Sequence, residues 1–526
     1  MSSEKDRYSP SLALTDEHAV SDKYADQTLR LIEAHGRDFS PLSPAEDRRF
    51  RYKVFGAVMG MCSAISILIF MDKATLGYAA ISGLFEETHI SKAQYNNLLT
   101  FFYVGYIAFL GPGHYLMQKL PLGKFVAVLV FLWGAILFLH CVAIRYAGLI
   151  VLRIALGAAE SVVVPAMEMT LGMFFVREEF AFIQPLLWMN SAIAPICTAF
   201  LSYGLLHAHS AVLPWKLLMI VTGGLSVVLG VVLWFFYPDN PARARFLSLR
   251  ERIHAIQRVQ RSSRSFIEQK HFKRYQFVEA LKDPVSWLFL LQAFTLMLCN
   301  NLTYGQQNLL TTAIGIDRLG STLVAAAGGA FFTCVCVVGI VLLRLWPRDF
   351  AFHGLLYCLP GICGGIGMVT LPWHKKISLL ACMLLAGNGY GVTYIIALGW
   401  TSSSASGYTK KITRNFMFMV GYSIANLISP QIWVPKDAPR YYGAWISQIV
   451  ISWVGTPVIL FVIRFILQHR NAQRTRWIAA LDPAERRALE TGHVKHGDVG
   501  TPVEHDVDLA MLDLSDFENM FFLYPI

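Results

Sequence analysis

Residues 148–175 read GLIVLRIALGAAESVVVPAMEMTLGMFF, an apolar run that contains only three ionisable side chains. An α-helix needs about 20 mostly apolar residues to cross the hydrocarbon core of a bilayer. This run is long enough to do so, and it therefore predicts a membrane-spanning helix.

Twelve runs of this kind occur along the chain, and the one just quoted is the fourth. Polar residues interrupt the first run at Asp72 and Lys73, and the eleventh is rich in Asn and Ser. The sequence therefore predicts an all-α polytopic membrane protein with twelve transmembrane helices in two six-helix halves. The predicted spans are residues 54–80, 94–117, 124–144, 148–173, 181–206, 214–237, 285–311, 319–343, 351–371, 377–400, 412–433 and 441–467.

The overall composition supports a membrane protein. Hydrophobic residues make up 55% of the 526 residues, and charged residues make up only 15%. An ordinary soluble domain has about 25% charged residues. A soluble enzyme of this length would need several charged surfaces, and the chain has too few charges to cover them.

The positions of Lys and Arg predict the orientation. The loops on the side of the N-terminal tail hold 19 of these residues, and the opposite loops hold 7. Without the central loop the counts are 8 and 7, so the central loop and the basic residues next to both tails decide the orientation. Because cytoplasmic loops are enriched in Lys and Arg, both termini are expected in the cytoplasm. This placement also accounts for the net charge of +10 without nucleic-acid binding.

Six spans, a charged loop and six more spans predict two halves around a site near the middle of the membrane. In the central loop, apolar residues between Leu247 and Val259 are interspersed with Arg. They predict an amphipathic helix that either lies on the inner membrane surface or forms a solvated linker. The expected regions are an N-terminal tail (1–52), a first half (53–237), a central loop (238–284), a second half (285–467) and a C-terminal tail (468–526).

The sequence lacks the motifs of several other classes. It contains no P-loop, so an ATP-driven pump is not expected, and it contains no HExxH motif or CxxC pair with a second half. The nine cysteines fall within or at the edges of predicted spans, which argues against an extracellular disulfide framework. We therefore expect no enzyme activity, no cofactor and no metal site.

Charged residues inside the fourth span are candidates for function, because ionisable side chains are costly in the membrane core. Arg153 and Glu160 are seven residues apart, so they share a helix face about 10.5 Å apart along the axis. An Arg can hold a carboxylate through two parallel hydrogen bonds, and a Glu can carry a proton. The alternative is that both charges only lock this span to its neighbours. Glu168, two turns beyond Glu160, is either an inward-facing polar residue or a gate contact.

The first span carries the adjacent charges Asp72 and Lys73. Lys73 could present its ammonium group to a substrate anion, and Asp72 is a further candidate for proton coupling. The alternative is that the pair lies near the end of the span and reaches water by snorkelling.

Four amide side chains complete the predicted substrate site, because later spans are too polar to face lipid. In the eleventh span, the alternative role for such residues is polar contact between helices. The four residues are Asn300 and Gln307 in the seventh span, Asn388 in the tenth and Asn426 in the eleventh.

Four segments of the chain resemble one transporter family. They are MDKATLGYAA (71–80), YNNLLTFFYVGYIAFLGPGHYLMQKLPLGK (95–124), PDNPARARFL (238–247) and SSSASGYTKK (402–411) followed by GYSIANLISPQIW (421–433). Over roughly residues 50–470 the chain resembles the major facilitator superfamily and, within it, the fungal allantoate permease branch of the anion:cation symporters.

The resemblance implies roles for several residues. Arg153, Glu160 and Pro165 fit the arrangement of the family's fourth span, and Lys73 stands where the family usually has Arg. Two departures are informative. The loop after the second span lacks the acidic residue of the usual superfamily gate, with Met117 or Gln118 in its place. The fifth span lacks the two trailing glycines of drug:proton antiporters.

The predicted function is proton-coupled uptake of a small organic anion by alternating access. The resemblance suggests allantoate or another ureide, nicotinate or a pantothenate-like carboxylate as substrate. The alternatives are an exporter of a fungal secondary metabolite and, in another class, a non-transporting nutrient sensor. We expect a monomer in the plasma membrane whose partners are the substrate, protons and lipid, with no nucleic acid.

Overall fold

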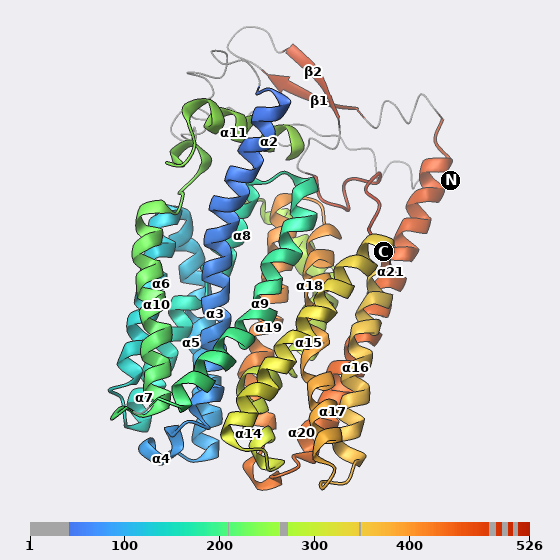
Figure 1. Ribbon diagram of the computed structural model, residues 1–526. Helices are drawn as coiled ribbons and strands as arrows, with labels where there is room; N and C mark the ends of the chain where they lie inside the picture. The colour runs from blue at the N-terminus through green and yellow to red at the C-terminus, as the bar shows by residue number, and fades with distance from the viewer. Residues whose placement is uncertain are drawn as a thin grey trace.

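The computed structural model describes residues 42–208, 210–263, 272–346, 349–482, 491–496, 503–508 and 514–526. The first 41 residues of the predicted N-terminal tail and the side chain of Gln118 lie outside the described residues. The described chain is an elongated helical bundle (Figure 1).

The first group of helices precedes the central loop. Its elements are α2 (Pro44–Val54), the π-helical turn η3 (Phe55–Met59), α3 (Gly60–Ala79), α4 (Leu84–Thr88), α5 (Lys92–Lys119), α6 (Leu122–His140), α7 (Tyr146–Glu160), α8 (Val163–Phe174), α9 (Arg177–Leu206) and α10 (Pro214–Phe236).

The central loop and the second group of helices follow, and a two-stranded antiparallel β-ladder lies in the C-terminal tail. The elements are η4 (Pro241–Arg243), α11 (Leu249–Ser263), α12 (Arg274–Lys282), α13 (Pro284–Met297), η5 (Leu302–Gln306), α14 (Gln307–Ala313), α15 (Arg318–Leu345), α16 (Phe350–Thr370), α17 (Lys376–Asn388), α18 (Tyr390–Ser403), α19 (Tyr408–Ile428), η6 (Ser429–Ile432), η7 (Pro435–Asp437), α20 (Tyr442–Ser447), η8 (Gln448–Gly455), α21 (Thr456–Ala479), β1 (Thr491–His496) and β2 (Val503–Asp508).

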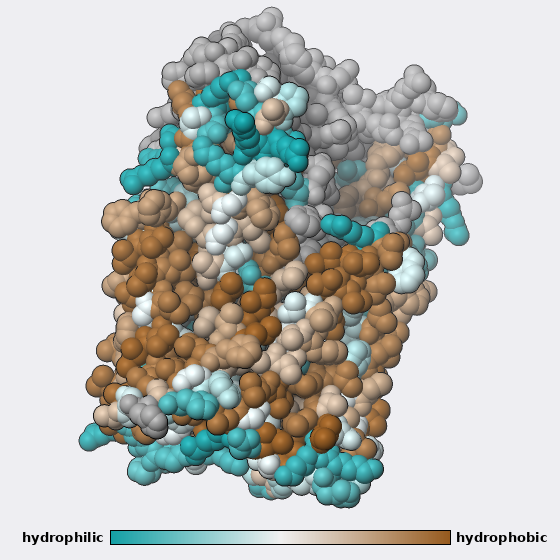
Figure 2. All heavy atoms as spheres, viewed as in Figure 1, coloured by the Kyte–Doolittle hydropathy of each residue, from teal (hydrophilic) through white to brown (hydrophobic). Residues whose placement is uncertain are grey.

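Ten helical segments of the described chain are long and apolar enough to cross a membrane. The more polar helices α5 and α19, of 28 and 21 residues, occupy the positions of the second and eleventh predicted spans. Together they make the twelve predicted spans. Figure 2 shows a broad apolar band around the bundle with hydrophilic residues at its two ends, as a bilayer-spanning surface requires.

The two ends of the bundle differ. One end, at the top of Figure 1, carries α2, α11 and the β-ladder, and we call it the tail end. The opposite end carries α4, α14 and α20, and we call it the far end. The amphipathic helix predicted in the central loop is α11, and its buried residues Ile253 and Ile256 pack on protein. Its charged face pairs with α2, where Lys53 lies 2.8 Å from Glu251. Helix α11 is therefore a packed element of the tail end.

Several spans are interrupted partway along their length. The fourth span breaks between α7 and α8 directly after Glu160, and the tenth breaks at Gly389 between α17 and α18. The seventh span contains the π-helical turn η5 between α13 and α14. Such irregular turns inside helices are frequent at functional sites, and they are tolerated within a membrane only where they face protein or a cavity.

Close packing of α5 against α7 fixes the position of the fourth span. A Cβ atom on Gly105 would lie 1.9 Å from the carbonyl oxygen of Ile154, and a Cβ atom on Gly157 would lie 1.9 Å from that of Phe102. Only glycine allows two helix backbones to approach so closely. Arg153 and Glu160 are therefore held at a fixed depth beside α5.

Candidate functional site

Two cavities lie between the halves and share Tyr304 as a wall. The larger covers about 490 Å³ of space that is partly open to solvent, and we call it the charged cavity. The smaller covers about 330 Å³ of such space, and we call it the amide cavity. All six residues predicted to bind substrate line one of the two. Lys73, Arg153, Asn300 and Asn426 line the charged cavity together with Asp72, and Gln307 and Asn388 line the amide cavity.

Three charged side chains of α3 and α7 beside the charged cavity are deeply buried. Asp72, Arg153 and Glu160 come from α3 and α7, and their exposed fractions are 2%, 4% and 2%. Asp72 interacts electrostatically with Arg153, Glu160 and Lys73, so the four side chains form one cluster. Glu160 does not line the cavity itself but stands next to Asp72, which does.

The hydrogen-bonding capacity of this cluster is largely unused. Among the described residues, Nε and Nη2 of Arg153, both carboxylate oxygens of Glu160 and Oδ1 of Asp72 have no hydrogen-bond partner. A buried polar group without a partner costs about 1–3 kcal/mol, and more when it is charged. Such an arrangement persists where a ligand or a proton supplies the missing contact in part of the working cycle. Arg153 and Glu160, which the sequence places about 10.5 Å apart along the helix axis, make no hydrogen bond with each other.

Lys73 points into the bundle. Its ammonium nitrogen lies 5.1 Å from the centroid of the Phe70 ring, and Lys73 lines the charged cavity. A cation over an aromatic face is stabilised by the ring's electrostatic field. The snorkelling alternative is therefore less favoured by the geometry than a position facing the cavity.

The amides fall into two kinds. Asn300 donates to Oδ1 of Asn426 at 2.6 Å and accepts from the Tyr390 hydroxyl at 3.1 Å, so these amides join helices as well as line the cavity. Part of the hydrogen-bonding capacity of Asn300 and Asn426 is therefore used in polar contacts between helices. In contrast, Nε2 of Gln307 has no partner among the described residues. Asn388 donates to the Leu384 carbonyl within its own helix at 2.9 Å.

Glu168 lies apart from the other candidates and lines neither cavity. Its carboxylate accepts a hydrogen bond from Gln184 of α9. Gln184 also accepts from the Trp188 indole at 3.2 Å, and Trp188 meets Tyr394 of the second half with ring centroids 5.7 Å apart. Glu168 is therefore linked through Gln184 and Trp188 to a contact between the halves, and its role as an inward-facing polar residue or a gate contact stays a prediction.

A group of hydrogen bonds closes the far end between the halves, and sequence reasoning did not identify it. The Tyr95 hydroxyl donates to the Gly305 carbonyl at 2.8 Å, and Asn96 donates to the Trp433 carbonyl at 2.9 Å. Gln306 donates to Asn96 at 2.9 Å. We call these contacts the far-end seal. The polar run at the start of α5 was its only signal in the sequence.

Within the described residues, no group of three or more His, Cys, Asp or Glu side chains is placed to hold a metal ion. The site chemistry therefore comes from one guanidinium, one ammonium, two carboxyl groups and several amides around two cavities. Such a set can bind a small polar ion and exchange protons.

Comparison with known proteins adds independent findings. A model of the Major Facilitator Superfamily matches residues 62–430. The chain is 47% identical to an uncharacterised transporter of Schizosaccharomyces pombe, over 96% of this chain and 89% of that protein. It is 42% identical to a high affinity cysteine transporter of Saccharomyces cerevisiae, over 98% of each chain. It is 30% identical to the allantoate permease of the same organism, over 96% of this chain and 91% of the permease.

Solved structures agree on the fold. A D-xylose-proton symporter has a TM-score of 0.60 at 13% identity, and the match covers 77% of this chain and 96% of the symporter. At this identity the likeness concerns the fold alone. It confirms the predicted all-helical membrane architecture.

Proposed function

The chain belongs to the major facilitator superfamily of membrane transporters, and on that premise we propose that it takes up a small carboxylate together with protons by alternating access. Membership confirms the superfamily resemblance seen in the sequence, and it identifies a multi-pass membrane carrier rather than an enzyme. Assignment to the allantoate permease branch and location in the plasma membrane are finer parts of the proposal.

The observation that carries the proposal is the buried, unsatisfied guanidinium of Arg153 at the wall of the charged cavity. A guanidinium presents parallel donors that match the two oxygens of a carboxylate. Lys73 adds a second positive charge to the same cavity. A small carboxylate in this cavity would complete the hydrogen bonds that the protein leaves open.

The relatives narrow the substrate class. Two relatives are named for a substrate, cysteine in one and allantoate in the other, and both substrates carry a carboxylate. An amino acid also carries an ammonium group. This group could donate a charge-assisted hydrogen bond to the carboxylate of Asp72, which lines the same cavity. We therefore rank a small amino acid such as cysteine first, and allantoate, nicotinate and pantothenate-like acids after it.

Proton coupling is assigned to the acidic pair Asp72 and Glu160. The two carboxyl groups belong to the same buried cluster, and together they offer one place to hold and release a proton. The far-end seal closes one entrance to the cavities, and alternation requires that this seal opens in the other half of the cycle.

Uptake by purified protein in liposomes with an imposed pH gradient tests the proposal. Labelled cysteine, allantoate, nicotinate and pantothenate would each be compared with its amide, which lacks the carboxylate. We expect at least one acid to accumulate while the gradient is present, and its amide to be excluded. Equal uptake of acid and amide, or accumulation that persists when an ionophore collapses the gradient, would contradict the proposal.

A further inference from the structure

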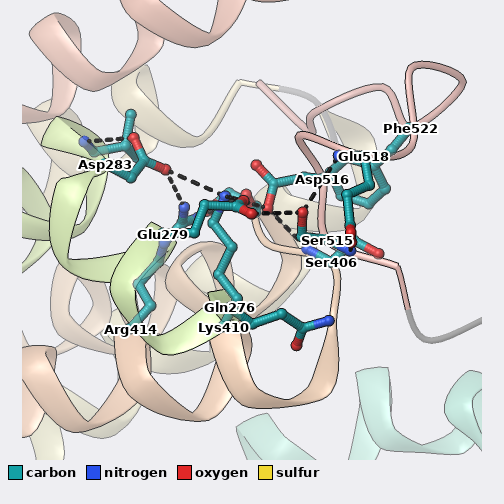
Figure 3. Close-up of polar contacts among 12 residues, drawn as sticks. Gln276, Glu279, Asp283, Ser406, Lys410, Arg414, Ser515, Asp516, Glu518 and Phe522 are labelled. Carbon is teal, nitrogen blue, oxygen red and sulfur yellow. Dashed lines mark hydrogen bonds and ion pairs between the residues drawn. The ribbon is translucent and has the colours of Figure 1, made fainter. Parts of the chain in front are cut away.

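The last described segment of the chain, residues 514–526, docks on the tail end of the second half (Figure 3). We call it the C-terminal segment. The Trp400 indole of α18 donates to the Pro525 carbonyl at 2.8 Å. The side-chain amide of Asn471 in α21 donates to the Tyr524 carbonyl at 2.8 Å and accepts from the Tyr524 backbone N–H at 2.9 Å. The segment is therefore held by directional contacts at several points.

A buried ion pair forms the centre of this docking site. The ammonium of Lys410 lies 2.8 Å from Asp516 and 2.5 Å from Glu279, and it stands 3.6 Å from the centroid of the Phe517 ring. The side chains of Lys410 and Asp516 are fully buried. The other carboxylate oxygen of Asp516 accepts from the Tyr524 hydroxyl at 2.7 Å. A buried ion pair is tolerated when its remaining hydrogen bonds are satisfied, and that condition is met here.

The docked segment joins the tail ends of helices that line the charged cavity deeper in the membrane. Helix α13 begins at the cap residue Asp283 and leads to Asn300, and α19 carries Lys410 near its start and Asn426 near its end. Asp283 accepts from Arg414 at 2.6 Å, so α13 and α19 are linked beneath the segment. The contacts seen for the segment are with α12, α18, α19, α21 and the turn at Ser406. It therefore fastens the tail end of the second half as one body.

We propose that the C-terminal segment is a displaceable latch that stabilises the state in which the far end is sealed, and that negative charge added at Ser515 releases it. The far-end seal and the docked latch occur together in this structure. Alternating access would move the tail ends of α18 and α19 relative to the first half, and the latch ties both helices to α21. The inference uses the two access states of a carrier and does not depend on the identity of the substrate.

Ser515 is the sensitive point of the latch. Its hydroxyl donates to Glu279 at 2.8 Å, and its backbone N–H donates to Glu518 at 2.8 Å. Its side chain is buried, with Asp516 as its neighbour in the chain. A negative charge at this position would face the carboxylates of Glu279 and Glu518, and like charges that are desolvated together disrupt docking.

The test uses full-length protein with a reporter cysteine, Leu99→Cys, in the wall of the charged cavity. A membrane-impermeant maleimide added from the far-end side labels this cysteine only when the far end opens. The parent chain without the reporter corrects for the nine native cysteines. We expect Ser515→Glu to raise the labelling rate about fivefold or more, the size of a typical coupling between linked sites. The matched control Ser515→Ala, which adds no charge, should stay within about twofold of wild type.

Unchanged labelling of Ser515→Glu, in protein that reaches the membrane in normal amount, would overturn the proposal. If Ser515→Glu fails to accumulate, deletion of residues 514–526 is measured with the same reporter. Faster labelling of the deleted chain supports the latch, and unchanged labelling refutes it. Loss of folding in both variants would also refute it, because the segment would then be a fixed part of the structure.

Discussion

Two clusters of buried charge lie in different regions of this protein, and they are built in opposite ways. The cluster beside the charged cavity contains Asp72, Arg153 and Glu160, and each has hydrogen-bonding atoms without a partner among the described residues. The cluster at the tail end of the second half contains Asp283, Lys410, Arg414 and Asp516, and all four are paired.

In the tail-end cluster, the charged side chains have hydrogen-bond and ion-pair partners. Arg414 donates to the Ser404 carbonyl at 2.6 Å, to Asp283 at 2.6 Å and to the Ser286 hydroxyl at 3.2 Å. Asp283 also pairs with Arg470 at 2.8 Å. Burial by itself raises the pKa of Asp283, but the interactions led by Arg414 outweigh it and hold the pKa below its usual value. Buried charge alone therefore does not indicate transport function; unsatisfied buried charge does.

The largest effect is expected from breaking the satisfied cluster. Arg414→Ala leaves a buried cavity and deprives Asp283 and Ser404 of their donor. Loss of one partner of a buried ion pair costs about 3–5 kcal/mol, so this variant should fold poorly and reach the membrane in small amount. Protein level and thermal unfolding in detergent measure this. Normal amounts of a stable Arg414→Ala protein would contradict the claim that the tail-end cluster is needed for folding.

The opposite result is expected for Arg153→Ala. This change removes a guanidinium that the protein leaves partly unpaired, so stability should hardly change. Loss of a desolvated charge contact costs about 2–5 kcal/mol, which is roughly 30-fold to several-thousand-fold in affinity for the transported acid. Arg153→Lys should restore only part of it, because Lys lacks the planar fork.

The matched control for this variant is Arg464→Ala, which removes an arginine that pairs with the half-exposed Asp349 outside the cavities. Transport and stability of the two variants would be measured in the same preparations. If Arg153→Ala transported normally, or lost stability and transport in proportion, Arg153 would have no direct role in substrate binding. Its role would then be structural, like that of the charges in the tail-end cluster.

Glu160→Gln separates proton coupling from packing. The amide keeps the shape of the side chain but cannot release a proton. We expect exchange of internal for external substrate to continue, because exchange does not require proton release, while uptake driven by a pH gradient fails. Both are measured in one liposome preparation. A parallel fall in exchange and net uptake would point to packing, and preserved pH-driven uptake would leave Asp72 and Glu168 as proton carriers.

The smallest effect is expected for a charge that is neither fully buried nor unsatisfied. Glu251 of α11 pairs with Lys53 at 2.8 Å. Partial burial raises its pKa, but hydrogen bonds from Lys53 and Ser248 outweigh this and lower it overall. A lowered pKa in the folded state gives stability that is present above the unfolded value of about 4.3 and is lost as the pH falls through the folded value.

Glu251→Gln should therefore lower the free energy of unfolding at pH 7 by less than about 1 kcal/mol, the usual range for a partly exposed pair. The difference between wild type and variant should shrink when thermal unfolding is repeated below about pH 4. A difference that grows at low pH would contradict the sign of this shift.

The sequence predicted the spans and the charges of the cavity, because both depend on residue type and on position within an apolar run. It did not predict pairing between distant segments. The predicted eleventh span begins at residue 412, whereas α19 begins at Tyr408, and nothing in the sequence indicated that Lys410 and Arg414 are fully buried. Their partners lie 131 residues away, in a segment that looked like an ordinary charged loop.

The same limit applies to the site itself. The sequence marked Asn300 and Asn426 as polar residues in spans, but not that they bond to each other across 126 residues. The polar run that contains Tyr95 and Asn96 did not show what these residues bond to, since their acceptors are backbone carbonyls of the second half. A helix pattern shows which face is polar, and only the packing shows which partner that face meets.

The central claim is that the unsatisfied guanidinium of Arg153 binds the carboxylate of the substrate. Calorimetric titration of purified wild type and Arg153→Ala with the best transported acid and with its amide, which lacks the carboxylate, tests it directly. We predict that wild type prefers the acid by about 30-fold or more and that Arg153→Ala binds acid and amide equally weakly. An unchanged preference for the acid in Arg153→Ala would contradict the account.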